Sequence, residues 1–378
     1  MVDELDTLLA QLELPPLLLA DDVRARLRAS SVAQATRESW KYTQLKKFVP
    51  TDAAVSEPTI SADGSPAAVV SRLSTQQSDG LNRHLGDADS SSRFPLADLA
   101  LLIAGDCLIV DIQSDRETDL SITFHPGINV PVLIRVAARA TLRLQETVVA
   151  SEFANHSLYL LIDEDASVEH ARTAFTSHCN HWSLTQAVLG VRSSYQLQQY
   201  LGGGNQRRYE TQIILDGRES NASLTGAYRV HSGGHLDQQI TVEHRAPDTL
   251  SEQRFHGIGA GKGSAIFNGR IHIHPDSPRS NAQLSNRNLA LHPDAIINTK
   301  PELEIYTDDV KCAHGATVGQ LSADSLFYLQ SRGIALPAAR QMLCRAFIRE
   351  CIEGPLADIA SEALLDEITT ALASNESL

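Results

Sequence analysis

The sequence predicts a mainly β protein with α-helical segments at both ends. Between about residues 96 and 318, short stretches alternate polar and apolar side chains, and Gly, Asn, Asp or Pro recur between them. An alternation with a period of two is the pattern of a strand that buries one face. Many short strands of this kind are typical of a β-solenoid, a sandwich or a barrel. The length of the region and its small residues favour a stacked β-helix, in which each coil buries its inner face against its neighbours.

Residues 1–95 are expected to form a helical segment followed by a connection. Leucine residues recur at helical spacing before Pro15, and a second helical pattern begins at Asp21. Residues 50–95 are rich in Ser, Ala, Asp and Pro and contain few large apolar side chains. We therefore expect this connection to be loosely structured.

The β core, residues 96–318, shows its alternation most clearly in residues 264–274. Asn268, Arg270 and His272 would share one face of that strand. The opposite face, which is the expected inner face of the coil, would consist of Ala265, Phe267, Gly269, Ile271 and Ile273. No strict short repeat is legible in the region, so periodicity alone also leaves a sandwich or a barrel open.

Residues 319–378 are expected to form a C-terminal helical domain. Ser322 can cap a helix that stops at Gly333, and Pro337 can occupy the first turn of a second helix. A third helix would open at Pro355. The apolar face of these helices must pack either on the end of the β core or on a partner protein.

The composition limits the classes of function. The chain has 378 residues, of which 42% are hydrophobic and 21% charged, as in folded globular proteins. Its net charge of −14 argues against nucleic acid as a partner. No stretch approaches the ~20 apolar residues of a membrane span, and no signal peptide is recognised. Five cysteines at irregular spacing fit free thiols in a reducing compartment. We therefore expect a cytoplasmic protein without a membrane association.

Cys312 and His314 are the leading candidate metal ligands. They lie two residues apart, where the strand pattern gives way to helices. If the strand continues through them, both side chains share one face. A thiolate and an imidazole make a soft ligand pair suited to iron, zinc or an iron–sulfur cluster. Two ligands do not complete a site, so the others are expected from elsewhere, for example from another chain.

Two other clusters are weaker candidates. His272 and His274 would share a strand face, but no third ligand is evident, which favours ordinary surface histidines. His178, Cys179 and His181 would occupy both faces of a strand, which favours a structural role.

Several remaining motifs are interpreted as structural. The glycine-rich stretch 257–264 is not a phosphate-binding loop, because Gly263 follows the lysine where such a loop has Ser or Thr. We interpret it as a corner between coils, so that any use of ATP belongs to a partner. Cys107, Cys344 and Cys351 are interpreted as buried packing residues.

Residues 308–334, which read DDVKCAHGATVGQLSADSLFYLQSRGI, resemble a known signature. The segment is similar to the C-terminal signature of the SufB/SufD family of iron–sulfur cluster assembly proteins, in the form of its SufD branch. Residues 37–43, RESWKYT, resemble an N-terminal element of the same branch. Weaker similarity runs through residues 268–271 and 283–289, whereas residues 50–95 contribute none.

The resemblance implies a right-handed parallel β-helix flanked by helices, and a scaffold rather than an enzyme. It implies a heterodimer with a SufB-like subunit through the late β-helix, and a SufC-like ATPase bound at the C-terminal helices. A transient iron–sulfur cluster would be shared with the SufB-like subunit, with His314 as a key ligand and Cys312 beside it. Flavin in the assembled complex is a further option that the resemblance leaves open. A homodimer of the isolated chain is another option, because an exposed β-helix face can pair with a second copy.

Two functions follow from this reasoning. In the first, the chain presents ligands for a nascent cluster at the interface with the SufB-like subunit. In the alternative, the chain is a purely structural partner that docks the SufB-like subunit and the SufC-like ATPase without ligating the cluster. A polysaccharide-cleaving β-helix enzyme is disfavoured, because no clustered carboxylates stand out on one face.

Overall fold

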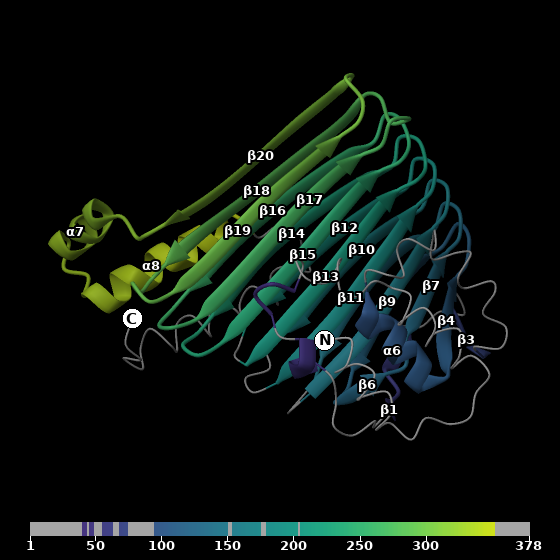
Figure 1. Ribbon diagram of the computed structural model, residues 1–378, viewed down its shortest axis with the longest axis horizontal. Coiled ribbons are helices and arrows are strands. Elements are labelled where there is room, and N and C mark those ends of the chain that lie inside the picture. Colours follow the sequence, from purple (N-terminus) through teal and green to yellow (C-terminus); the bar gives the residue numbers. More distant parts are fainter. Residues whose placement is uncertain are drawn as a thin grey trace.

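The computed structural model shows a parallel β-solenoid of about seven turns, with two helices at its C-terminal end (Figure 1). It describes residues 40–43, 45–48, 55–62, 68–74, 94–149, 153–174, 179–202 and 205–351. The prediction of a mainly β fold with a parallel β-helix core is therefore confirmed. Among the helices within these ranges, none is long and apolar enough to cross a membrane.

Two sheets face each other across the core, and successive strands of each coil alternate between them. Sheet A has the main order β19-β17-β15-β13-β11-β9-β7-β4-β3. Its strands are β3 (Ala68–Ser74), β4 (Asp106–Ile112), β7 (Val132–Val136), β9 (Phe153–Ile162), β11 (Asn180–Leu189), β13 (Gln206–Leu215), β15 (His235–His244), β17 (Ser264–Ile273) and β19 (Ile296–Ile305), with β1 (Val55–Ser56) and β6 (Gly127–Asn129) beside them.

Sheet B has the order β2-β5-β8-β10-β12-β14-β16-β18-β20. Its strands are β2 (Thr59–Ala62), β5 (Glu117–Phe124), β8 (Thr141–Val148), β10 (Ser167–Ala174), β12 (Ser194–Leu201), β14 (Asn221–Val230), β16 (Leu250–Gly259), β18 (Ser280–Ala290) and β20 (Val310–Gly319). From β5 onward the pairing within sheet B is parallel and in continuous register.

The core lies between the two sheets and consists of the inward side chains of each coil. In β17, the predicted inner residues Ala265, Phe267, Ile271 and Ile273 all belong to this core. Asn268 and Arg270 lie on the other face and are only partly buried. The alternation read from residues 264–274 is therefore confirmed, and β17 buries the face that points toward the opposite sheet.

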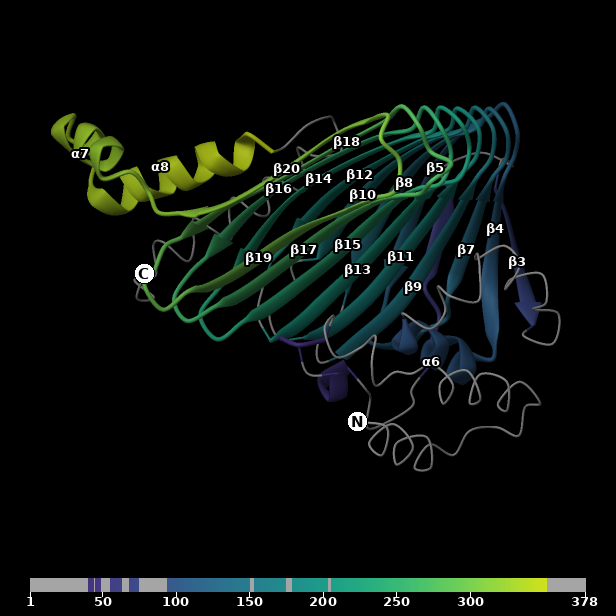
Figure 2. The ribbon, with the colours of Figure 1, turned by 45° about the horizontal axis from the view of Figure 1, so that its top comes forward.

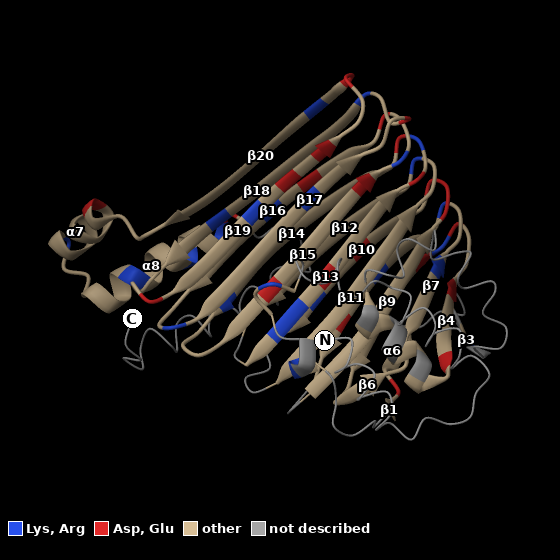
Figure 3. Ribbon diagram, viewed as in Figure 1, with Lys and Arg blue, Asp and Glu red and all other residues tan. Residues whose placement is uncertain are grey.

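The corner turns that lead from sheet A to sheet B share one backbone feature. Except for the last turn, between β19 and β20, each contains a non-glycine residue with φ between 54° and 62°, and these residues are Asp115, Arg139, Asp165, Arg192, Glu219, Asp248 and Arg279. The spacing grows from 24 residues between Asp115 and Arg139 to 31 between Asp248 and Arg279. The lengthening coil explains why the sequence shows no strict repeat. Arginine–carboxylate pairs, such as Arg139 with Asp115 at 2.6 Å, join neighbouring turns along this edge (Figure 3).

The N-terminal part differs from the prediction in two respects. Residues 50–95 were expected to be loosely structured, yet they contain β1, β2 and β3, of which β2 and β3 pair antiparallel with β5 and β4. Helix α6 (Pro95–Ala104) lies within the region predicted to be all β. It begins with a proline, ends at the left-handed Gly105, and buries an apolar face beside sheet A. Helices were predicted for residues 1 to about 48. Residues 1–39 lie outside the described ranges, and residues 45–48 form the short 3-10 helix η1 (Leu45–Phe48).

The C-terminal helices match their predicted boundaries. Helix α7 (Ala323–Ser331) begins at Ser322, whose hydroxyl accepts a hydrogen bond from the Ser325 amide at 3.2 Å. Helix α8 (Leu336–Arg349) packs through Cys344 and Ile348 on the outer face of sheet B. Figure 2 shows both helices at the end of the solenoid opposite β3 and β4. The third predicted helix, from Pro355, lies outside the described residues.

Candidate functional site

Cys312 and His314 lie on β20, the last strand of sheet B. Parallel pairing with β18 places Cys312 beside Ala282 and His314 beside Leu284. Ala282 and Leu284 are core residues, so Cys312 and His314 occupy the inner side of the final coil. The strand does continue through both residues, as the same-face prediction required. Among the described residues β20 pairs only with β18, which leaves this coil open at its end.

The two side chains differ in their surroundings. Cys312 is partly buried and packs against the core, whereas His314 is exposed. Partial burial raises the pKa of the Cys312 thiol, and a backbone hydrogen bond at Ala282 acts in the opposite sense. A metal that binds here must therefore displace the thiol proton, which a soft cation does readily.

The pair does not form a complete metal site. In the part of the chain that the structure describes, no group of three or more His, Cys, Asp or Glu side chains could hold a metal ion. The edges around the pair carry exposed apolar side chains instead. They are Ile296 and Ile305 of β19, Tyr306 after it, and Val318 of β20. Unpaired strand edges with exposed apolar groups are the features of a surface that another chain covers.

His272 and His274 are placed together but not as a metal site. Their rings stack at 4.1 Å on the outer face of β17. Glu304 lies 3.9 Å from His272, and the Arg270 guanidinium donates to the same carboxylate at 2.9 and 2.5 Å. A cation already neutralises this carboxylate, which supports the interpretation as ordinary histidines.

The other motifs occupy structural positions. Cys107, Cys344 and Cys351 are buried, as interpreted. The glycine-rich stretch 257–264 contains the end of β16 and the turn into β17, which is a corner between coils. Cys179 is also buried, whereas His178 lies outside the described residues.

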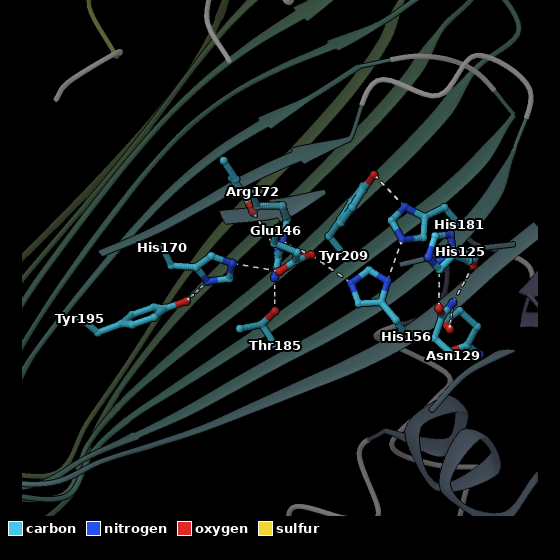
Figure 4. Close-up of polar contacts among 12 residues, drawn as sticks. His125, Asn129, Glu146, His156, His170, Arg172, His181, Thr185, Tyr195 and Tyr209 are labelled. Atoms are coloured by element: carbon cyan, nitrogen blue, oxygen red, sulfur yellow. Dashed lines mark hydrogen bonds and ion pairs between the residues drawn. The ribbon is translucent and has the colours of Figure 1, made fainter. Parts of the chain in front are cut away.

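A cluster of buried charges inside the early coils is the feature that sequence reasoning missed (Figure 4). Glu146 of β8 is fully buried, and its carboxylate accepts from His156 at 3.0 Å and from Arg172 at 2.9 Å. His170 Nε2 lies 3.0 Å from its second oxygen. His181 continues the cluster, at 3.2 Å from His156. The predicted structural role of His181 is thus correct, but its partners come from other coils.

Burial and charge compete within this cluster. Burial alone would raise the pKa of Glu146, but the Arg172 guanidinium and the two imidazoles outweigh it and hold the pKa well below its usual range. Burial lowers the pKa values of His156, His170 and His181. The cluster therefore consists of one ion pair surrounded by neutral imidazoles.

A sequence signal for this cluster did exist. Leu142 and Leu144 establish the inner face of β8, and Glu146 is the next residue with the same parity. In β10, Val168 lies on the inner face, and His170 and Arg172 are the next two residues with the same parity. Charged residues at inner positions of a buried strand indicate a buried polar cluster, although only the coil stacking shows that these strands are neighbours.

A second buried ion cluster anchors residues 40–43 on the outer face of sheet A. The Trp40 ring stacks on the Arg208 guanidinium, with 3.9 Å between the guanidinium carbon and the ring centroid. Arg208 donates to Asp237 at 2.6 Å. The Thr43 hydroxyl donates to the same carboxylate at 2.5 Å and lies 2.8 Å from His235. The WKYT motif therefore attaches the N-terminal segment to β13 and β15.

The fold is a parallel β-solenoid whose open final coil carries a cysteine and a histidine on its inner face. Comparison with known families gives the particular class. Residues 124–347 match the family model described as SUF system FeS cluster assembly, SufBD core domain. Since the match covers more than half of the chain, the protein belongs to the SufB/SufD family of iron–sulfur cluster assembly proteins, and it is SufD-like.

Individual relatives agree with this assignment. The chain is 32% identical to iron–sulfur cluster assembly protein SufD of Escherichia coli over 54% of its length and 49% of the relative. It is 34% identical to a SufBD family protein of Synechocystis, over 53% of this chain and 45% of that protein. The chain is also 32% identical to the chloroplastic protein ABCI7 of Arabidopsis thaliana, over 53% of this chain and 42% of that protein. The chain thus spans about half the length of the curated relatives it matches.

Proposed function

We propose that this chain is the SufD-like subunit of a SUF assembly complex and presents ligands for a nascent iron–sulfur cluster. His314 and Cys312 would supply one side of the cluster site, and a SufB-like subunit would supply the other. The chain would act as a scaffold and not as an enzyme. The observation that carries the proposal is the position of both side chains on the inner face of an open terminal coil.

The open coil supports an interface at this place. The outer edges of β19 and β20 have no strand partner among the described residues. A SufB-like chain that adds strands to both edges would bury the exposed Ile296 and Val318. It would also enclose Cys312 and His314 between the two proteins, away from bulk water, and bring its own ligands to them.

The C-terminal helices are the proposed docking site for the SufC-like ATPase. Helix α7 buries none of its residues, and Phe327 is 73% exposed. Helix α8 is fixed to the solenoid by Ile348 and by a 2.7 Å hydrogen bond from His256 to the Phe347 carbonyl oxygen. An ATPase that binds α7 and α8 would therefore act on the same sheet that ends in β20. The chain itself contains no recognisable nucleotide loop.

The main test is cluster assembly by complexes that contain His314→Ala or Cys312→Ala. Each variant would be co-expressed with the SufB-like and SufC-like proteins of the same organism, and the complex purified anaerobically. Iron, sulfide and the visible absorbance of the cluster are measured after reconstitution. We expect normal complex formation, a lost cluster with His314→Ala and a smaller loss with Cys312→Ala.

Lys311→Ala and Thr317→Ala are matched controls, because these residues lie on the opposite face of the same strand. Both should assemble clusters normally. If the double variant of Cys312 and His314 assembled clusters at the normal rate, the proposal of ligand presentation would be wrong and the purely structural alternative would stand.

Flavin in the assembled complex is tested separately, by the fluorescence of flavin released from the denatured complex. Gel filtration of the isolated chain tests the homodimer.

A further inference from the structure

Buried side chains from four strands form a continuous hydrogen-bonded chain inside the early coils (Figure 4). It runs from Arg207 of β13 through Tyr209, His181 and His156 to Glu146 of β8. Both ends have a fixed chemical polarity. A guanidinium can only donate hydrogen bonds, and a carboxylate can only accept them.

The direction of the chain follows from its acceptor end. Arg172 donates to Glu146 at 2.9 Å, and the pair is ionised. The Nε2 atom of His156, 3.0 Å from the same carboxylate, must therefore carry a hydrogen. In a neutral imidazole the other nitrogen is then bare. The Nδ1 atom of His156 must accept, and its partner at 3.2 Å is Nε2 of His181.

The same argument continues to the donor end. Because His181 donates through Nε2, its Nδ1 atom is bare and accepts from the Tyr209 hydroxyl at 3.1 Å. The Tyr209 oxygen in turn accepts from Arg207. A side branch has the same polarity, since Tyr195 donates to Nδ1 of His170 at 2.9 Å and His170 faces Glu146. Every hydrogen bond on the path from Tyr209 to Glu146 thus points toward the carboxylate.

We infer that His156 and His181 act as a single proton-binding site, which admits at most one proton and only if the Tyr209 hydroxyl turns away. A proton added to Nδ1 of His181 keeps the hydrogen bond to His156 but meets that hydroxyl at 3.1 Å. A proton added to Nδ1 of His156 would face the N–H of His181, and two donors would oppose each other at 3.2 Å. Relief requires His181 to move its own hydrogen from Nε2 to Nδ1. That hydrogen then faces Tyr209, whose O–H must turn away from its present acceptor.

This coupling makes the early coils sensitive to acid as one unit. The titratable and charged groups that face the two imidazoles come from every strand around them. They are Glu146 of β8, His170 and Arg172 of β10, Tyr195 of β12, and Arg207 and Tyr209 of β13. In the unfolded chain both histidines take up protons independently, so the folded state loses stability as the pH falls below their unfolded values.

The test replaces His181 with glutamine and measures the free energy of unfolding in urea between pH 7 and 5. Glutamine can turn its amide oxygen toward His156, which then accepts a proton beside Glu146. We expect the folded wild-type pair to stay unprotonated across this range, because a proton on it would oppose two donors or displace the Tyr209 hydroxyl. The slope of stability against pH counts protons, so His181→Gln, whose folded state protonates His156, should reduce the slope by about two protons. Independent histidines would give a reduction of about one, which would overturn the inference.

His244→Gln is the matched control. His244 is also buried, but its ring nitrogens lie 2.8 Å from the hydroxyls of Thr249 and Ser251, which can donate or accept. This substitution should reduce the slope of stability against pH by the equivalent of about one proton.

A second measurement on the unmodified protein does not depend on how the variants fold. Nitrogen-15 NMR of labelled histidine should show Nε2–H tautomers for His156 and His181 at pH 7. Acidification should change both signals in one step. An Nδ1–H tautomer at pH 7, or two separate titrations, would contradict the inference.

Discussion

Replacement of Arg172 by methionine should destabilise the protein strongly, because it leaves a buried carboxylate without its cation. Arg172 is 0% exposed and donates to Glu146 at 2.9 Å, to Gln199 at 3.2 Å and to Thr185. Methionine keeps most of the side-chain length but none of these donors. Removal of one partner from a buried ion pair costs about 3–5 kcal/mol. We expect a loss of this size in the free energy of unfolding.

The assay is urea unfolding at pH 7, followed by circular dichroism. Arg139→Met provides the control, since Arg139 binds Asp115 through two bonds of 2.6 and 2.8 Å, but both side chains are 59% exposed. Its urea midpoint should not change measurably, because solvent screens an exposed pair. If Arg172→Met shifted the midpoint no more than Arg139→Met does, the reasoning about the buried cluster would be refuted.

Three further predictions concern other parts of the fold. Thr43→Val removes a hydroxyl that donates to Asp237, and should cost about 1–3 kcal/mol of stability and expose the N-terminal segment to limited proteolysis. Unchanged proteolysis would argue against the anchor. Gly257→Ala should lower the melting temperature, because its Cβ atom would lie 2.3 Å from the Tyr228 ring; a wild-type melting curve would contradict this. Burial lowers the pKa of His244 to about 4, so its stabilisation is present above pH ~6.5 and lost as the pH falls toward 4. Urea unfolding at several pH values should show a flatter dependence in His244→Gln than in the wild type.

Local patterns in the sequence determined the strands, the C-terminal helix ends and the pairing of Cys312 with His314 on one face. The alternation in β17 predicts its buried residues because side-chain direction in a strand depends only on residue parity. Ser322 predicts the start of α7 because a cap acts on amides within its own turn. Helix α6 was missed, although Pro95 and Gly105 carry comparable local signals.

The tertiary structure decided the features that depend on which coils are neighbours. Parity places Cys312 and His314 together, but only the register with Ala282 and Leu284 shows that this face points inward at an open end. Glu146 meets Arg172 across 26 residues of sequence. The coil length grows along the chain, so no fixed spacing in the sequence could bring such partners together. The residues for each site are therefore legible in the sequence, whereas the stacking of unequal coils determines which of them meet.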